Sequence, residues 1–437
     1  MKKKPFRIGI VGFGTVGRGT AQILLLERER MARQAGVDIE LARIADVRTD
    51  LGDTLGLGPG VFTTDFRAII NDPSIDVVVE LVGGTTIAAS VITETLKAGK
   101  HAVTANKALL AEQGNLLFAM AREQERMIGF EAAVCGGIPV IRSLREGLAG
   151  NTIQSLFGIV NGTANFILSK MRFEKLTFKA ALKEAQRLGF AEADPTFDIK
   201  GIDSAHKISI LASLAFGQFY RYQDFHIEGI TAISDLDITY AEEMGYVIKL
   251  LGVAIMTPSG RPFISIAPTL IPADEILAAV NYEYNGVFIK GNFVGHTLYT
   301  GKGAGGLPTG SAVVSDIVHI ARYGACEKDY LLMYPDGVHG SVVSIDEIEA
   351  EYYIRLTAFD KPGVMAKISG VLGAHGISIA TLMQKESTVK GDAIIVIKTH
   401  ASLSRNVRSA LDEVNRLDVT VEKAVKLRII NDLYKQQ

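Results

Sequence analysis

Two opposite charges lie four residues apart in a segment whose other periodic positions are apolar. Asp203 and Lys207 belong to "GIDSAHKISILASLAFG", residues 201–217, which has the apolar spacing of a helix. Residues at i and i+4 lie one above the other on a helix, so both charges share the stripe of Ile210 and Leu211. Such a partly desolvated pair is either a structural salt bridge or a site for proton transfer.

The loop ahead of this helix is acidic. It contains Glu192, Asp194 and Asp198, with Pro195 stiffening it. Clustered carboxylates repel one another unless a cation binds, and an ammonium-bearing small molecule would supply one, with Glu192 and Asp203 as acceptors. A metal ion is disfavoured here because the segment lacks His or Cys at ligand spacing and lacks a glycine-punctuated calcium loop. A solvated acidic loop is the alternative.

The first 130 residues contain the elements expected of an α/β, Rossmann-type doubly wound parallel sheet. Short β-branched runs alternate with helical patterns, as in successive βαβ units. The predicted strands are residues 6–11, 39–46, 76–83, 101–105 and 127–133.

A glycine motif joins the first predicted strand to a helix. Gly12, Gly14 and Gly17 have the G-x-G-x-x-G spacing, with Phe13, Thr15 and Val16 between them. This spacing suits a tight turn, close approach of a diphosphate and close helix packing, so these residues predict a dinucleotide site. A simple turn is the alternative.

The second predicted strand ends at Asp46, where a carboxylate can accept hydrogen bonds from ribose hydroxyls. This position favours NAD. Arg43 and Arg48 lie close by in the sequence, and either guanidinium could bind a 2′-phosphate and admit NADP. Asp46 opening a turn without binding a ligand is the third interpretation.

The remaining chain predicts two further domains. We expect a dinucleotide-binding domain at residues 1–135, completed by about 301–330, and an α+β substrate-binding and dimerisation domain at 136–300. A linker over 331–350 precedes a C-terminal βαββαβ unit of the ferredoxin-like type at 351–430.

The composition argues against several classes of partner. The formal charge of −2 provides no basic field for nucleic acid or anionic lipid. Cys135 and Cys326 cannot form a disulfide framework, and no signal peptide or long apolar run is evident, so we expect a cytoplasmic protein without a membrane partner.

These motifs together resemble the homoserine dehydrogenase family, and the C-terminal unit resembles an ACT regulatory domain. The stretch "AQRLGFAEADPTFDIKGIDSAHK" (185–207) matches that family's signature. Further matches are "GFGTVG", "ELVGG" (80–84), "TANKALL" (104–110), "EAAVCGGIP" (131–139), "NGTANFIL" (161–168) and "GKGAGGLPTGSAVVSDI" (301–317), with "DKPGVMAKISGVLGAHGISI" in the ACT-like unit.

The resemblance implies reversible NAD(P)-dependent conversion of L-homoserine to L-aspartate 4-semialdehyde. It implies that Glu192 and Asp203 hold the substrate ammonium and that Lys107 and Lys207 serve the carboxylate and the reacting oxygen. We favour Lys207 as the proton shuttle and Lys107 as the substrate ligand, although the two roles could be exchanged. His206 points off the stripe of Lys207 and is expected to be a packing residue.

The same resemblance adds cofactor contacts at Gly83, Thr104, Lys107 and Gly303. The glycines around Gly303 are expected to pack against the nicotinamide end, with a solvent loop as the alternative. It also implies a monovalent cation site, expected to hold sodium, formed by Glu131 and the backbone carbonyls of Val134, Gly136 and Ile138. The alternative is a glycine hinge in which Glu131 caps a nearby helix.

The ACT-like unit implies an amino-acid effector, for which threonine is the natural candidate, or a structural role in dimerisation. We expect a homodimer or homotetramer. Two other functions remain open from the sequence: another amino-acid semialdehyde dehydrogenase or reductase, and a non-catalytic amino-acid-sensing regulator on the same scaffold.

Overall fold

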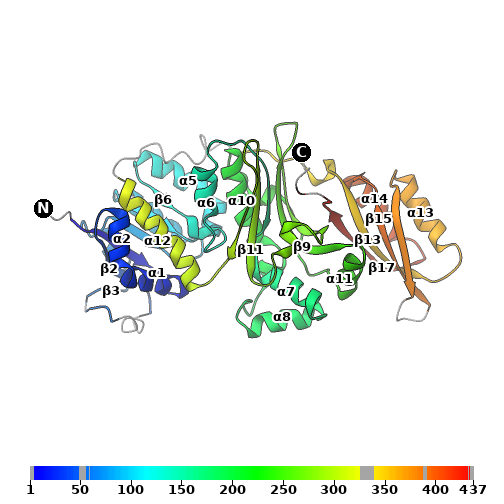
Figure 1. Cartoon of the computed structure of the whole chain (residues 1–437), viewed down its shortest axis with the longest axis horizontal. Coiled ribbons are helices and arrows are strands. Elements are labelled where there is room, and N and C mark those ends of the chain that lie inside the picture. The colour runs from blue at the N-terminus through cyan, green and yellow to red at the C-terminus, as the bar shows by residue number, and fades with distance from the viewer. Residues whose placement is uncertain are drawn as a thin grey trace.

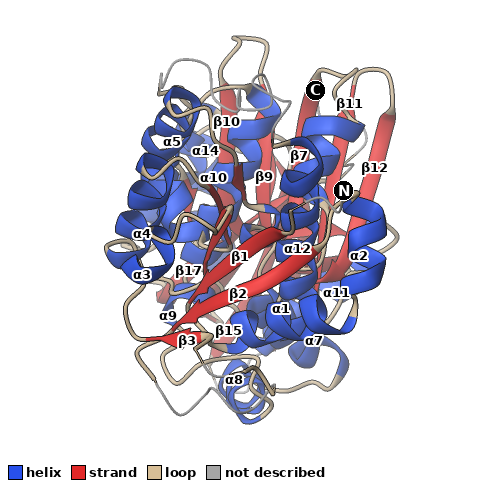
Figure 2. Ribbon diagram, turned by 90° about the vertical axis from the view of Figure 1, so that its left-hand side faces the viewer, coloured by secondary structure: helices blue, strands red, loops and turns tan. Residues whose placement is uncertain are grey.

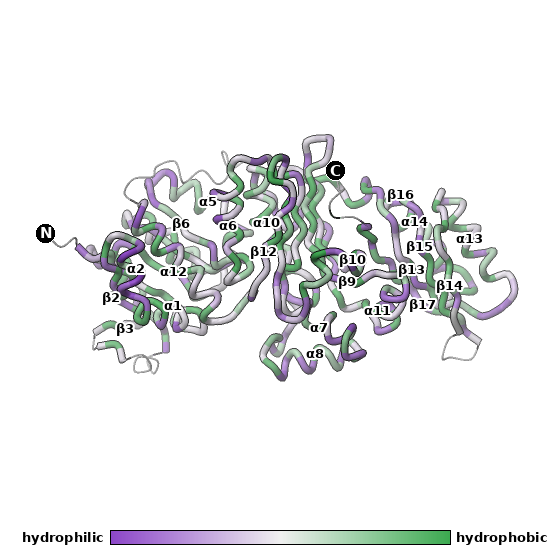
Figure 3. Tube along the Cα trace, in the orientation of Figure 1, coloured by the Kyte–Doolittle hydropathy of each residue, from purple (hydrophilic) through white to green (hydrophobic). Residues whose placement is uncertain are grey.

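The computed structural model describes residues 4–48, 56–58, 60–324, 339–386, 391–431 and 433. Three units lie in a row along the long axis: an N-terminal unit, a central sheet with its helices, and a C-terminal unit (Figure 1). Hydrophobic residues follow the central strands, whereas α2 and much of α8 are hydrophilic (Figure 3). Among the described residues, no helix combines the length and apolar character needed to span a bilayer.

The N-terminal unit is the predicted doubly wound parallel sheet, with strand order β3-β2-β1-β4-β5-β6. Figure 2 looks toward this sheet, with β1 and β2 in front. Its strands are β1 (Phe6–Val11), β2 (Ile39–Ala45), β3 (Phe62–Thr63), β4 (Val77–Glu80), β5 (His101–Thr104) and β6 (Ile128–Gly129). Its helices are α1 (Thr15–Leu26), α2 (Arg28–Ala35), α3 (Arg67–Ile70), α4 (Ile87–Lys97) and α5 (Lys107–Glu123).

The strand predicted over 127–133 is shorter than expected. It ends at Gly129, and Glu131–Ala133 form a 3₁₀ helix instead. Asp316 explains the change, because its carboxylate accepts a hydrogen bond from the Glu131 N–H at 2.8 Å and so takes it out of strand pairing. The two-residue strand β3 was not predicted, since so short a run carries no periodic signal.

Helix α12 (Gly306–Tyr323) returns from the central unit to the N-terminal sheet. Its Val313 and Ile317 share a core with Ile8 and Ile10 of β1. Glycine permits this packing: a Cβ at Gly19 of α1 would lie 2.2 Å from the Gly306 carbonyl oxygen. The chain that closes the N-terminal unit therefore comes from a distant part of the sequence.

The central and C-terminal units share one mixed sheet, with strand order β12-β11-β7-β9-β10-β17-β13-β15-β14. The central strands are β7 (Ile153–Ile159), β9 (Tyr246–Met256), β10 (Pro262–Pro272), β11 (Tyr284–Gly291) and β12 (Gly295–Lys302), with β8 (His226–Ile227) paired to β10. The associated helices are α6 (Val140–Arg142), α7 (Gly162–Phe173), α8 (Phe178–Arg187), α9 (Thr196–Ile199), α10 (Ile202–Phe216) and α11 (Asp235–Glu243).

The C-terminal unit has the predicted βαββαβ order. It comprises β13 (Glu349–Phe359), α13 (Val364–Ala374), β14 (Ile379–Glu386), β15 (Asp392–Thr399), α14 (Ser404–Val414) and β17 (Thr420–Ile429), with the two-residue β16 (Ser402–Leu403) beside β13. Unexpectedly, β17 pairs in parallel with β10 through Thr269–Arg428 and Leu270–Ile429. The unit therefore continues the central sheet.

Candidate active site

Three adjoining cavities lie along the carboxyl ends of β1, β4 and β5, where ligands bind in open parallel sheets. The first, of about 540 Å³, is lined by Gly12, Gly14, Asp46 and other residues. It shares Leu81 and Val82 with the second, of about 310 Å³. The second shares Lys107 with a third of about 540 Å³ that lies between the N-terminal and central units.

The glycine turn is shaped to receive a diphosphate. Gly12 has φ +99°, and a Cβ there would lie 2.6 Å from the Leu81 carbonyl. A Cβ at Gly17 would lie 2.3 Å from the Gly12 carbonyl oxygen, whereas one at Gly14 would meet open space. No side chain caps the start of α1, so its first N–H groups and the positive end of its dipole remain available to an anion. These residues fit a dinucleotide.

Asp46 lies in the first cavity and is bound to the glycine turn. Its carboxylate accepts hydrogen bonds from the N–H of Phe13 at 2.7 Å and of Arg48 at 2.9 Å. Burial alone would raise the pKa of Asp46, but the hydrogen bonds from Arg48 and Phe13 hold it below its usual value. Arg43 instead lies 3.9 Å from Asp72, which leaves Arg48 as the guanidinium that lines the first cavity.

A buried carboxylate orders the loop of the second cavity. Glu80 accepts hydrogen bonds from the N–H of Val82 at 2.8 Å and of Gly83 at 3.1 Å, and from the Thr104 hydroxyl at 2.6 Å. Thr104 is fully buried, so the structure places it beneath the cavity, where it positions Glu80. Asn106 donates from its side chain to the Gly84 carbonyl and ties the loop to the start of α5.

The charges singled out in the sequence converge in the third cavity. Lys207 Nζ lies 2.7 Å from Asp203 Oδ2, and Lys107 Nζ lies 3.2 Å from Asp203 Oδ1. Lys207 also donates to the Val160 carbonyl at 2.7 Å. The Lys207 side chain is 11% exposed and that of Lys107 is 39% exposed, so Lys207 is the deeper of the two.

The electrostatics of this cluster favour the charged forms of Asp203 and Lys207. Burial alone would raise the pKa of Asp203, but Lys207, Lys107 and the hydrogen bonds of the site outweigh it and hold the pKa far below its usual range. Burial alone would lower the pKa of Lys207, but Asp203 more than compensates and raises it. Burial and the neighbouring Asp203 raise the pKa of Asp198. Lys207 is therefore a protonated group beside two carboxyl groups, Asp203 with a lowered pKa and Asp198 with a raised one.

Asn161 is a site residue that was not singled out from the sequence. Its Nδ2 donates to Asp198 at 2.7 Å and to Asp203 at 2.8 Å, while its Oδ1 caps α7 by accepting from the Ala164 N–H at 2.7 Å. The available signal was an Asn between a predicted strand and a helix, which is the N-cap position. The spacing of residues along the chain does not predict its contact with Asp203, which lies in a distant segment.

The other predicted residues take differing positions. Glu192 is exposed but lines the same cavity as Asp203 and Lys207, and Gly303 lines it too. His206 is 2% exposed and packs edge-on against Tyr222 with ring centroids 4.4 Å apart. Burial raises the pKa of the Cys135 thiol to about 11, as expected of an unreactive cysteine. Cys326 lies outside the described residues.

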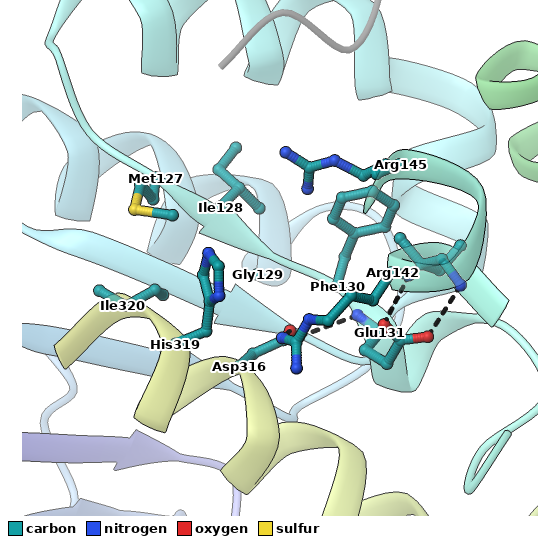
Figure 4. Close-up of a pocket in the computed structure, with 11 residues that line it drawn as sticks. Met127, Ile128, Gly129, Phe130, Glu131, Arg142, Arg145, Asp316, His319 and Ile320 are labelled. Atoms are coloured by element: carbon teal, nitrogen blue, oxygen red, sulfur yellow. Dashed lines mark hydrogen bonds and ion pairs between the residues drawn. The ribbon is translucent and has the colours of Figure 1, made fainter. Parts of the chain in front are cut away.

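Glu131 lies near the junction of the units, where Figure 4 shows it with Arg142 and Asp316. Its carboxylate accepts hydrogen bonds from the N–H of Ile141 at 2.8 Å and of Arg142 at 2.9 Å, at the start of α6. This is the helix-capping arrangement. Among the described residues, no group of three or more His, Cys, Asp or Glu is placed to hold a metal ion.

Comparisons with known proteins agree with this geometry. Three family models match the chain. The model for homoserine dehydrogenase matches residues 139–318, the model for the NAD binding domain of homoserine dehydrogenase matches residues 12–131, and the ACT domain model matches residues 352–418. The homoserine dehydrogenase of Pseudomonas aeruginosa is 44% identical over 432 residues, covering 98% of this chain and 99% of its own.

Solved structures give the same result. A homoserine dehydrogenase from Thiobacillus denitrificans has a TM-score of 0.91 and 42% identity, with 98% of this chain and 99% of that chain covered. A hyperthermophilic archaeal homoserine dehydrogenase in complex with NADPH has a TM-score of 0.61 and 28% identity, over 72% of this chain and 97% of that chain.

Fold, site and comparisons define an NAD(P)-dependent oxidoreductase with a C-terminal ACT domain. The chain belongs to the homoserine dehydrogenase family and interconverts L-homoserine and L-aspartate 4-semialdehyde. The two other functions left open by the sequence are thereby set aside.

Proposed function

We propose that the third cavity binds L-homoserine with its ammonium toward Glu192 and Asp203, its carboxylate toward Lys107 and its hydroxyl toward Lys207. The observation that carries this proposal is the buried Asp203 flanked by two lysine ammonium groups at 2.7 and 3.2 Å. Three donors already occupy the two oxygens of Asp203, so an arriving ammonium would share Oδ1 with Lys107. The cofactor would supply the hydride acceptor, or the donor in reverse.

In the reducing direction, Asp203 keeps Lys207 protonated, so its Nζ carries a proton that it can donate to the carbonyl oxygen as the alcohol forms. In the oxidising direction, Lys207 would first release a proton to solvent, and its neutral Nζ would then take the hydroxyl proton. A substrate ammonium that shares Asp203 favours this release, because it weakens the attraction that raises the pKa of Lys207. Lys107, the more exposed lysine, is better placed to meet a carboxylate arriving from solvent. Asn161 keeps Asp198 and Asp203 in place throughout.

The test compares Lys207→Met with Lys107→Met. Loss of a positioned acid–base group lowers turnover by about 10²–10⁴-fold, so Lys207→Met is expected to reduce kcat, whereas Lys107→Met is expected mainly to raise KM for L-homoserine. Lys200→Met, which alters an exposed lysine in the same segment, is the control. Wild-type turnover in Lys207→Met would refute the assignment, and a kcat loss confined to Lys107→Met would exchange the two roles.

For the cofactor, we propose a preference for NAD over NADP through Asp46, with the diphosphate on residues 12–17 and the nicotinamide near Gly83, Lys107 and Gly303. The position of Asp46 in the first cavity supports this preference, and Arg48 beside it opposes it.

We also propose a sodium ion near the turn formed by residues 134–138. Because the Glu131 carboxylate already caps α6, the ion would have to be held chiefly by the carbonyls of Val134, Gly136 and Ile138. Replacing sodium by a bulky organic cation in the assay should lower activity, and unchanged kinetics would remove this proposal.

The domain limits are proposed as 1–135 with about 301–330, 136–300, a linker at 331–350 and 351–430. Separate buried clusters in the N-terminal and C-terminal units support the outer limits, while residues 325–338 lie outside the described part.

The family resemblance supports three further proposals: threonine as the ACT effector, a homodimer or homotetramer, and a cytoplasmic location. Steady-state inhibition by L-threonine and sedimentation analysis test the first two.

A further inference from the structure

Lys249 is a buried lysine that the proposed mechanism does not use. It lies on β9 and is 3% exposed. Its Nζ donates to the Val280 carbonyl at 2.6 Å and to Asn281 Oδ1 at 2.8 Å, and it lies 3.3 Å from Asn165 Oδ1. All three oxygens are uncharged, which is unusual because buried lysines are normally paired with an acid.

Burial, with a smaller effect of Arg172, lowers the pKa of Lys249 to about 7. Both the ammonium and the neutral amine are therefore present near neutral pH. An ammonium has three N–H donors and an amine has two, so each form can serve the two contacts shorter than 3 Å. Lys249 thus holds Val280 and Asn281 in either protonation state.

The segment that Lys249 holds is the 280–284 loop, which links a 3₁₀ turn (Ile276–Ala279) to β11. Asn165 Nδ2 donates to the carbonyls of Val280, Tyr282 and Tyr284 at 3.0–3.1 Å. Tyr282 has φ +56°, a left-handed conformation that a non-glycine residue keeps only where its surroundings fix it. The contacts from Asn165 and Lys249 supply that constraint.

The loop forms a wall of the substrate cavity. Glu283 lines the cavity together with Asn161 and Gly162. Gly162 packs so closely that a Cβ there would lie 2.9 Å from the Glu283 carbonyl oxygen. The N–H of Asn165 in turn donates to the Asn161 carbonyl at 3.1 Å, so the turn of α7 that bears Asn161 also carries the residue that fixes the loop.

We propose that Lys249 is a positioning residue for the substrate cavity, whose amino group fixes the 280–284 loop on β9 and α7 and thereby places Glu283 where it contacts the substrate. This inference rests on the third cavity being the homoserine site. Glu283 would act directly on the substrate, and Lys249 only through Glu283.

A double-mutant cycle between Lys249→Met and Glu283→Ala tests the coupling. Because a small misplacement of a binding group can lower catalysis by about 10- to 100-fold, each single variant is expected to lower kcat/KM for L-homoserine by about tenfold. The double variant should be no worse than Glu283→Ala alone. NADH binding, followed by fluorescence, should be unchanged in all three.

Lys398→Met is the control. It alters another partly buried lysine in contact with β9, through the Tyr246 hydroxyl at 2.9 Å, and should retain wild-type kcat/KM.

Independent effects of the two substitutions, or wild-type kcat/KM in Lys249→Met, would overturn the inference. If Lys249→Met does not fold, Asn281→Ala removes one acceptor of the same amino group and replaces it in the cycle with the same criteria. Loss of turnover in Lys207→Met alongside wild-type behaviour in Lys249→Met would defeat only this inference. Wild-type behaviour in Lys207→Met and in Glu283→Ala would defeat the cavity assignment as well.

Discussion

At the residue scale, Arg48 and Asp46 line the first cavity with opposite charges. Arg48 Nε lies 3.2 Å from Asp46 Oδ1, and the arginine side chain is 51% exposed, so it can turn toward a 2′-phosphate. A charge-assisted hydrogen bond contributes about 1.5–3 kcal/mol, so Arg48→Ala should lower kcat/KM with NADP by about tenfold or more. Asp46→Ala should lower kcat/KM with NAD instead.

Arg43→Ala provides the matched comparison, because Arg43 lies beside Asp72 rather than in the cavity. It should leave the ratio of kcat/KM values for NAD and NADP unchanged. An unchanged ratio in Asp46→Ala would remove Asp46 from the explanation of cofactor preference.

A second prediction at this scale concerns His206 and acid stability. Burial lowers the pKa of His206 to about 4, below the value of about 6.5 in an unfolded chain. The unfolded state therefore binds more protons between these pH values, and stability is lost as the pH falls from about 6.5 toward 4. This loss should be on the order of 1–3 kcal/mol for one such histidine.

His206→Phe keeps the ring packing against Tyr222 but removes the titration. Urea unfolding at pH 7 and pH 4.5 should show a smaller acid-induced loss of stability in the variant than in the wild type. Equal losses in both proteins would contradict the prediction.

At the element scale, Asn161 has two roles at the start of α7 that substitutions can separate. Asn161→Ala removes the helix cap, at a cost of about 1 kcal/mol, and also frees Asp198 and Asp203, so stability and kcat/KM should both fall. Asn161→Asp keeps a capping oxygen but adds a negative charge beside two carboxylates. It should therefore retain most of the stability measured by thermal unfolding while kcat/KM falls.

Thr177→Ala is the control for the cap alone. Thr177 caps α8 by accepting from the Ala180 N–H at 3.4 Å. This variant should lose some stability with wild-type kcat/KM. Full activity in Asn161→Asp would show that the amide is not needed to hold the two acids.

At the scale of the whole molecule, a buried ion pair joins the ACT unit to the central unit. Arg355 of β13 lies 2.7 Å from Asp237 of α11, whose side chain is fully buried, and the Tyr353 hydroxyl donates to the same carboxylate at 2.9 Å. Removing one partner of a buried pair costs about 3–5 kcal/mol because it leaves the other charge uncompensated. Arg355→Met should lower the free energy of unfolding by that order, and Asp237→Asn with Arg355→Met should recover much of it.

Equilibrium unfolding in urea measures these differences. Equal destabilisation in the single and double variants would show that the pair is not what joins the two units. Because β10 also pairs with β17, the ACT unit should unfold together with the central unit rather than in a separate transition.

The sequence by itself determined the features that depend on neighbours along the chain. Strand–helix alternation predicted the parallel sheet, the glycine spacing predicted the turn after β1, and the C-terminal periodicities predicted the βαββαβ order. The i, i+4 spacing of Asp203 and Lys207 placed their side chains together, because helix geometry fixes that distance wherever the helix lies.

Only the tertiary structure decided which distant segments meet. It brought Lys107 and Asn161 to Asp203, joined β17 to β10, and set the 280–284 loop against Lys249. Local periodicity shows which face of an element is buried but not what packs against it. Those pairings depend on the register of whole sheets and on the complementary shapes of helix faces, neither of which local spacing specifies.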